Sequence, residues 1–458
     1  GINVQAGILT AKNIIDATDA QNNTRVGSGA GDAFDGTNPT HNTLIGYNAG
    51  TEITTGGYNT AVGSQALDAN TTGAQNTSLG YNSMTSNTTG AYNTAVGYRA
   101  LLNNTTANNN TAIGWDTLKS SSTGANNLAV GYKALYASTT ADNNTALGAN
   151  ALEASTTGHS NTAVGKSALN ANTTANNNTA VGYFSLKANT TGTQNTAVSQ
   201  ALQANTTGSY NTSMGMYSGE SNTTGSYNSA LGRSALNQNT TGSNNTAIGH
   251  QALYANTTAN DNTALGQRSL YANTTGTRNT GIGVSALAAC NNDDNVAVGW
   301  QAMKVGTTAT DSIAIGSQAL VAVTTGSYNT AIGRNAMDNL TTGQHHVAIG
   351  YVALRSLTTG TFCVGVGNYA AYLNTTGSRI TAVGYNACAV NTTGNDNTGF
   401  GAQTLDSNTT GHNNVGVGNS ALKANTTASN NTAVGFESLK ANTTGAANTA
   451  LGSESLVA

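Results

Sequence analysis

Charged residues, aromatic residues, proline and cysteine are all scarce in this 458-residue chain. Charged residues make up 8% of it, aromatic residues 5%, and there is a single proline. In an ordinary globular domain, charged residues alone account for about a quarter. The formal net charge is −3, with no basic stripe and no polybasic segment. We therefore expect neither nucleic acid nor a membrane surface as a partner of this segment.

Other patterns that would indicate chemistry or targeting are also missing. No apolar run approaches the roughly 20 residues of a membrane-spanning helix, and no signal-peptide pattern is present. The three cysteines fall at different repeat positions and encode no disulfide ladder, and His345 and His346 lack Cys, Asp or Glu neighbours at metal-ligand spacing. Carboxylates occur singly, without the converging pair that glycan cleavage needs. We expect no metal, no cofactor and no enzymatic activity.

What the chain has in abundance is one 17-residue repeat, represented by residues 59–75 with the sequence NTAVGSQALDANTTGAQ. The opening position, Asn in most repeats, can be followed from Asn42 to Asn448 through 25 repeats, two of which have 16 residues. One lacks the Gly expected after Val198, and the other has a five-residue loop at 290–294. A fixed short period predicts stacked coils instead of a globular core. Disorder is less favoured because every repeat carries regular apolar positions.

Two short strands are expected in each repeat, with positions numbered from the opening Asn. In Thr60–Val62, positions two and four share a strand face, and since position four is always apolar, we predict that this face is buried. Position three is almost always Ala, Gly or Ser, and this size limit predicts close packing against another backbone. The second strand covers residues 66–69, with Leu67 and Ala69 pointing into the coil.

The corner that follows has two alternative compositions. Where the Gly at position fifteen is replaced by Ala, as at Ala107, position seventeen is Asn or Asp, as at Asn109. Asn and Asp tolerate left-handed backbone angles, which Gly otherwise supplies. We therefore expect the two corner types to exchange one left-handed residue for another.

These patterns predict an all-β fold, a parallel β-roll or β-helix solenoid with 17-residue coils. At about 4.8 Å per coil, 25 coils would form a rod of about 120 Å. One large aliphatic residue per coil is a small core, and we expect other copies of the chain to cover the small residues at position three, so we predict an intertwined or side-by-side homotrimer. Residues 1–22 are expected to be a strand-rich N-terminal segment, residues 23–41 a degenerate first coil, and residues 42–458 the array with an incomplete last repeat. Because it ends within a repeat, we expect the chain to be part of a longer or processed polypeptide.

Two resemblances are carried by short motifs. Residues 295–299 (NVAVG), 312–316 (SIAIG) and 346–350 (HVAIG) resemble the N-S-V-A-I-G signature of trimeric autotransporter adhesin heads. That resemblance implies a left-handed parallel β-roll assembled as a trimer, although those heads use shorter repeats without the Asn-Thr-Thr-Gly corner. Residues 1–11 and 23–30 are similar to passages in bacteriophage tail-fibre and other virion proteins. Together the resemblances imply an extracellular fibre.

We therefore expect a non-enzymatic structural protein, the rigid trimeric shaft of a virion tail fibre that projects a host-attachment end. Its partners would be its own copies, other virion or surface-fibre proteins, and a host-surface glycan or receptor. The alternative is a bacterial cell-surface adhesin head that binds host or matrix by avidity. A more remote alternative is an ice-binding protein that uses the threonines of the Asn-Thr-Thr corners. The same corners match a glycosylation acceptor, but their recurrence is explained by turn formation.

Position six is often aromatic and supplies the candidate binding residues. Exposed rings could stack on a sugar or a receptor, whereas rings at a corner commonly cover the gap between coils. The candidates are Tyr47, Tyr81, Tyr98, Trp115, Tyr132 and Trp300.

Overall fold

The computed structural model describes residues 19–34 and 39–456. Two compact units, residues 1–227 and residues 228–458, are treated separately below as the N-terminal and C-terminal units. Apart from residues 19–22, the predicted N-terminal segment lies outside the described residues. The described part of the chain contains 26 strands of three residues each and no helix.

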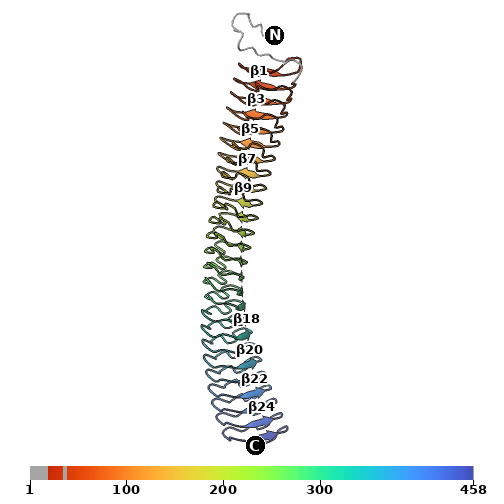
Figure 1. The fold of residues 1–458 in the computed structure, drawn as a ribbon. Helices are drawn as coiled ribbons and strands as arrows, with labels where there is room; N and C mark the ends of the chain where they lie inside the picture. The colour runs from red at the N-terminus through yellow and green to blue at the C-terminus, as the bar shows by residue number, and fades with distance from the viewer. Residues whose placement is uncertain (1–18, 35–38, 457–458) are drawn as a thin grey trace. The chain divides into compact units, whose positions relative to one another are not determined.

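Strands recur once per coil in both units, as Figure 1 shows. Those of the N-terminal unit are β1 (Thr24–Val26), β2 (Thr43–Ile45), β3 (Thr60–Val62), β4 (Thr77–Leu79), β5 (Thr94–Val96), β6 (Thr111–Ile113), β7 (Leu128–Val130), β8 (Thr145–Leu147), β9 (Thr162–Val164), β10 (Thr179–Val181), β11 (Thr196–Val198) and β12 (Thr212–Met214). Those of the C-terminal unit are β13 (Ser229–Leu231), β14 (Thr246–Ile248), β15 (Thr263–Leu265), β16 (Thr280–Ile282), β17 (Val296–Val298), β18 (Ile313–Ile315), β19 (Thr330–Ile332), β20 (Val347–Ile349), β21 (Val364–Val366), β22 (Thr381–Val383), β23 (Thr398–Phe400), β24 (Val415–Val417), β25 (Thr432–Val434) and β26 (Thr449–Leu451).

Within each unit, every strand pairs in parallel with the equivalent strand of the next coil. Thr60 faces Thr77 and Val62 faces Leu79 across β3 and β4, and the same register is kept where a coil is one residue short. The predicted all-β parallel solenoid with 17-residue coils is therefore confirmed. Parallel pairing is possible here because each coil returns the chain to the start of the next strand.

The prediction of which strand face is buried was wrong. In β2 to β26 the middle residue, position three, is buried, whereas positions two and four are half-buried or exposed. Ala61 points into the coil with Ala66 and Leu67, and all three are fully buried. A coil this narrow has room on the sheet side only for a small residue opposite the Leu at position nine. Because neighbouring strand residues point to opposite faces, a small residue inside forces the β-branched residues outward.

The second predicted strand is also wrong, since residues 64–69 form turns. Gln65 and Leu67 have φ angles of 57° and 58°, in the left-handed region. The change of backbone hand lets consecutive residues at positions eight and nine both face inward, which a strand would not allow. Ala69, at position eleven, is only half-buried.

Two glycine positions are set by contact between neighbouring coils. Gly63, at position five, has φ of 138°, and a Cβ there would lie 2.4 Å from the carbonyl oxygen of Gly80. Gly73, at position fifteen, is not left-handed, but a Cβ there would lie 2.3 Å from the carbonyl oxygen of Gly90. Position seventeen is left-handed with Tyr58 as well as with Asn109. The predicted exchange of left-handed residues at the corner is therefore wrong: close packing, not backbone hand, restricts position fifteen.

Buried asparagines join one coil to the next. The Asn59 carboxamide donates to the carbonyl oxygen of Gly73 at 3.0 Å and accepts from the backbone N–H of Asn76 at 2.9 Å. A second column, at position twelve, links Asn87 to Asn70 at 2.8 Å. Each side chain thus satisfies backbone groups that burial would otherwise leave without partners.

Candidate functional surfaces

The outward strand face carries Thr, Ser or an aliphatic residue at position two and an apolar residue at position four in all 26 strands. Neither position is charged in any strand. Position-four side chains are substantially exposed, with values of 38% for Ile45, 46% for Leu79 and 55% for Phe400. Each unit therefore presents a regular apolar row, larger than the patches that monomeric proteins usually expose.

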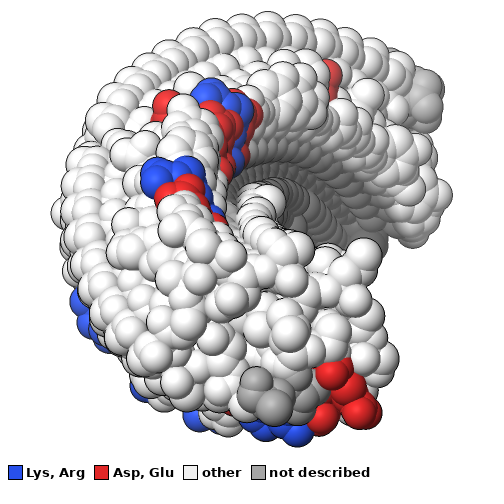
Figure 2. Space-filling view, turned by 90° about the horizontal axis from the view of Figure 1, so that it is seen from below, with Lys and Arg blue, Asp and Glu red and all other residues white. Residues whose placement is uncertain are grey.

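Charged side chains gather instead at positions seven and ten. The surface in Figure 2 is uncharged over most of its area, with the charged groups in a few clusters. In the N-terminal unit the charged residues at these two positions are Asp68, Arg99, Asp116, Lys119, Lys133, Glu153, Lys187 and Glu220. In the C-terminal unit they are Arg268, Lys304, Asp338, Arg355, Asp406, Lys423, Glu437, Lys440 and Glu454.

Many of these groups bond to the equivalent position of an adjacent coil. Arg99 forms a two-point ion pair with Asp116, with both N–O distances 2.7 Å. Glu153 accepts a hydrogen bond from the Asn170 carboxamide at 3.0 Å and lies 4.0 Å from Lys133. The charges therefore compensate one another, and this face has no strongly anionic or cationic field.

The structure brings three of the six candidate aromatics together. Tyr81 and Tyr98 stack with ring centroids 5.6 Å apart, and Tyr98 lies 4.4 Å from Trp115. The rings face one another along the coil axis, so Tyr98 is only half-buried and presents an edge, with Arg99 over its face. This arrangement is typical of rings that cover the gap between coils.

The other three candidates lie apart from this stack. Tyr47 is two coils before Tyr81, Tyr132 has the Lys133 ammonium 5.4 Å from its ring centroid, and Trp300 belongs to the C-terminal unit. All three side chains are exposed.

A second set of aromatics, at position seventeen, was not selected from the sequence. Tyr328, His345 and Phe362 stack in successive coils with centroids 5.0 Å apart and planes within 4°. The stacked pairs His41 with Tyr58 and Tyr210 with Tyr227 have the same geometry. These aromatic residues are separated by one repeat length, and that spacing could have identified them from the sequence.

The ice-binding alternative depends on the threonines of the Asn-Thr-Thr corners. The Thr71 hydroxyl, at position thirteen, donates to the carbonyl oxygen of Thr88 at 3.1 Å, and the Thr88 hydroxyl donates to Thr105 at 3.0 Å. Position fourteen, occupied by Thr72 and Thr89, is exposed. The corner therefore offers one column of exposed threonines, because the adjacent hydroxyls are engaged between coils.

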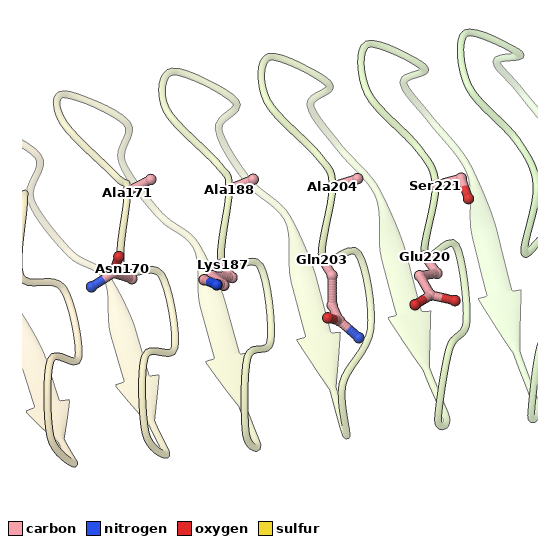
Figure 3. A pocket seen from close by; sticks show the side chains of 8 residues that line it. All are labelled: Asn170, Ala171, Lys187, Ala188, Gln203, Ala204, Glu220 and Ser221. Atoms are coloured by element: carbon pink, nitrogen blue, oxygen red, sulfur yellow. The ribbon is translucent and has the colours of Figure 1, made fainter.

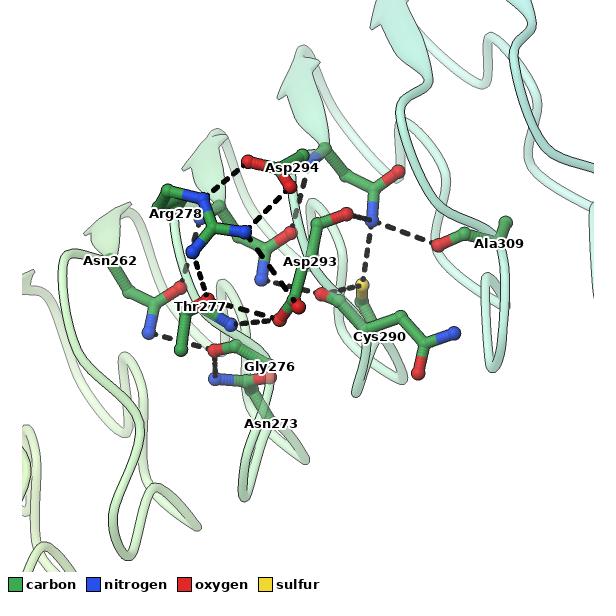
Figure 4. A network of polar contacts seen from close by, with 12 residues as sticks. Asn262, Asn273, Gly276, Thr277, Arg278, Cys290, Asp293, Asp294 and Ala309 are labelled. Carbon is green, nitrogen blue, oxygen red and sulfur yellow. Dashed lines mark hydrogen bonds and ion pairs between the residues drawn. The ribbon is translucent and has the colours of Figure 1, made fainter.

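The short loop at 290–294 is held by acidic side chains, as Figure 4 shows. Asp293 accepts from the backbone N–H of Thr277 at 2.7 Å, and Asp294 pairs with Arg278 at 2.6 Å. The Arg278 guanidinium holds the pKa of the Asp294 carboxyl below its ordinary value. These contacts compensate for the missing residue and keep both acidic side chains paired.

His346 replaces the position-one Asn and reproduces its bonding. Its Nε2 lies 2.8 Å from the carbonyl oxygen of Gly360, and its Nδ1 accepts from the backbone N–H of Cys363 at 3.1 Å. Because a carbonyl only accepts, Nε2 carries the proton and the ring is neutral. Burial lowers the pKa of His346 to about 4. Both ring nitrogens are occupied, which leaves neither for a metal ion.

The remaining reactive groups are enclosed. Cys290, Cys363 and Cys388 are buried free thiols, and burial raises the pKa of Cys363 to about 11 and that of Cys388 to about 12. Thiolates are the reactive form, so these cysteines are suited to packing. Across residues 19–34 and 39–456, no group of three His, Cys, Asp or Glu could hold a metal ion. The same residues include no helix long and apolar enough to cross a membrane.

No known family matches the chain, and a search of curated proteins gives no significant match. The class of protein is therefore defined by the fold, a parallel β-solenoid of tandem repeats.

Proposed function

We propose that the chain is a non-enzymatic structural fibre, the shaft of a virion tail fibre that projects a host-attachment end. The observation that carries the proposal is the uncharged apolar row on every described coil. A catalytic or ligand-specific surface would concentrate distinctive residues at one place, whereas this row repeats the same chemistry from coil to coil. Repetition of this kind suits a spacer that assembles along its length.

The partner best suited to the row is a second and a third copy of the same chain. The row can be matched coil by coil only by a surface whose features repeat at the same distance along the axis. Another copy of the chain has that repeat distance because its coils are the same. The absence of charge at positions two and four means that no ion is buried on contact. Position three is buried inside the coil, so the face that other copies would cover is this row, and we propose a homotrimer around a common axis.

Substituting Glu for Ile315 and Ile332 together is expected to convert the trimer to a monomer. Both side chains point outward from successive coils, so the charges would oppose assembly but leave the coil interior intact. The measurement is native mass spectrometry, with far-ultraviolet circular dichroism to check the fold. The control variant, Gln251→Glu with Gln318→Glu, adds the same charge at position seven and should remain trimeric. A monomeric wild-type chain, or an unchanged mass in the Ile variant, would refute this interface.

The extracellular location and the virion role have their own test. An antibody raised against the purified array is expected to label tail fibres of virus particles in immunogold electron microscopy. Labelling confined to the bacterial outer surface would instead support the alternative, an adhesin whose many equivalent weak sites gain strength by avidity. Sequencing the flanking coding region separates the same two cases, since an adhesin should continue into a coiled-coil stalk and a membrane anchor.

A further inference from the structure

One groove interrupts the regular surface of the N-terminal unit, and Figure 3 shows its lining. It has a volume of about 630 Å³ and crosses four successive coils. Each coil contributes a polar side chain from position ten and a small one from position eleven. The lining residues are Asn170, Lys187, Gln203 and Glu220, with Ala171, Ala188, Ala204 and Ser221 beside them.

The groove is a local feature of these coils. Its third coil is the one that lacks the Gly after Val198, and there Ser199 and Gln200 adopt left-handed φ angles of 66° and 53°. The Gln203 carboxamide donates to the carbonyl oxygen of Gln200 at 3.3 Å and so is tied to the shortened corner. Elsewhere position eleven holds residues as large as Val305 and Leu373. Ala or Ser is nevertheless the usual residue at position eleven, so the small residues keep the groove open while the shortened corner is what sets these coils apart.

The four polar side chains lie in a line, and part of their bonding capacity is used within the protein. The Asn170 Nδ2 donates to the carbonyl oxygen of Asn150 at 3.1 Å and to Glu153 at 3.0 Å, so Asn170 offers its carboxamide oxygen, an acceptor. Asn170 and Gln203 present carboxamides, while Lys187 and Glu220 present one positive and one negative charge. The Lys187 ammonium lies 4.3 Å from the centroid of the Phe184 ring. With no net charge, this line gives little attraction to phosphate groups. Between the polar groups, the alanines and the aliphatic stems present apolar surface, so the lining is mixed in character. It suits a ligand rich in hydroxyl groups, each of which both donates and accepts.

We propose that this groove binds a linear polysaccharide lying along the coil axis. Neighbouring coils are about 4.8 Å apart, a spacing comparable to the length of one sugar in an extended glycan. Successive sugars can therefore meet Asn170, Lys187, Gln203 and Glu220 in turn, with the small residues of position eleven giving room for the rings. The proposal is independent of trimer assembly, because it uses positions ten and eleven and not the outward strand face.

The test is affinity electrophoresis of the full chain in gels that contain a soluble linear polysaccharide. Hydroxyethylcellulose is the neutral probe and alginate the anionic one. We expect retardation by at least one of them, and a loss of about tenfold in apparent affinity in Lys187→Ala, because the substitution removes the charged hydrogen-bond donor of the groove. Lys423→Ala is the matched control, since it removes the same charge at position ten outside the groove.

A second variant fills the groove without removing a polar group. Ala188→Leu places at position eleven the residue that Leu373 already supplies in another coil, so the fold should be retained, as circular dichroism would check. We expect it to abolish retardation, whereas Ala424→Leu, the same change outside the groove, should not. No retardation by either probe, or equal losses in Lys187→Ala and Lys423→Ala, would overturn the proposal.

Discussion

Acidification from pH 7 to pH 4 is expected to destabilise the coil that contains His346 by about 3 kcal/mol. The imidazole is buried and neutral, with Nδ1 facing the backbone N–H of Cys363 and Nε2 facing the carbonyl oxygen of Gly360. A proton added to Nδ1 would oppose the N–H and remove a hydrogen bond. Burial disfavours the charged imidazolium, so the pKa of His346 is about 4 in the folded chain, below its ordinary value of 6.5.

Whether acid raises or lowers the stability depends on how His346 binds a proton in the folded and in the unfolded chain. Above pH 6.5 the imidazole is neutral in both the folded and unfolded chain, so the full stability is present. Between pH 6.5 and about 4 only the unfolded chain binds the proton, and stability falls as the pH falls. Below pH 4 both states are protonated and this contribution changes no further.

Hydrogen exchange of the backbone amides in residues 329–363, corrected for intrinsic rates, measures this local stability. His346→Asn restores the residue found at position one in most coils and should remove the excess pH dependence. His345→Asn is the control, because His345 is exposed and stacks between Tyr328 and Phe362. Equal pH dependence in the wild-type chain and in His346→Asn would contradict the assignment.

The substitutions Ala61→Leu and Leu67→Gly are each expected to lower the free energy of unfolding. In the double variant we expect a loss that is smaller than the sum of the two single losses. Leu at position three overfills a packed interior at a cost of about 1–3 kcal/mol, and removing the position-nine Leu leaves a cavity worth about 2–5 kcal/mol. One coil of the chain already combines a large residue at position three with a Gly at position nine. Leu44 stands at position three opposite Gly50 at position nine, where an added Cβ would lie 2.9 Å from Leu44 Cδ2 and 2.7 Å from Ile53 Cδ1.

Chemical denaturation of the four chains in a double-mutant cycle measures this coupling, which should be about 0.5–3 kcal/mol in favour of the double variant. Val62→Leu is a control, because it adds volume to an outward-facing side chain. Additive costs, or a larger effect from Val62→Leu than from Ala61→Leu, would mean that position three does not face the coil interior.

The candidate surfaces were predicted unevenly. Exposed position-six aromatics such as Tyr47 and Trp300 could be selected from the sequence because the corner position recurs every 17 residues. Their stacking was not predictable, since it depends on the direction in which each ring leaves the backbone. The groove beside Lys187 and Gln203 could not be predicted either, because it needs a shortened corner and a row of small side chains to meet on one side of the coil.

The sequence by itself determined the period, the strand in each coil and the parallel register, because each coil contacts mainly its own near-copies and so repeats their geometry. Only the tertiary structure decided which strand face is inside. The side chains of Thr60, Ala61 and Val62 alternate between two strand faces, but this alternation does not tell which face lies inside the coil. The apolar residue at position four was the more obvious candidate for the core. The left-handed residue Leu67 fills the narrow interior from the opposite side, so only a small residue fits at position three and Val62 is turned outward.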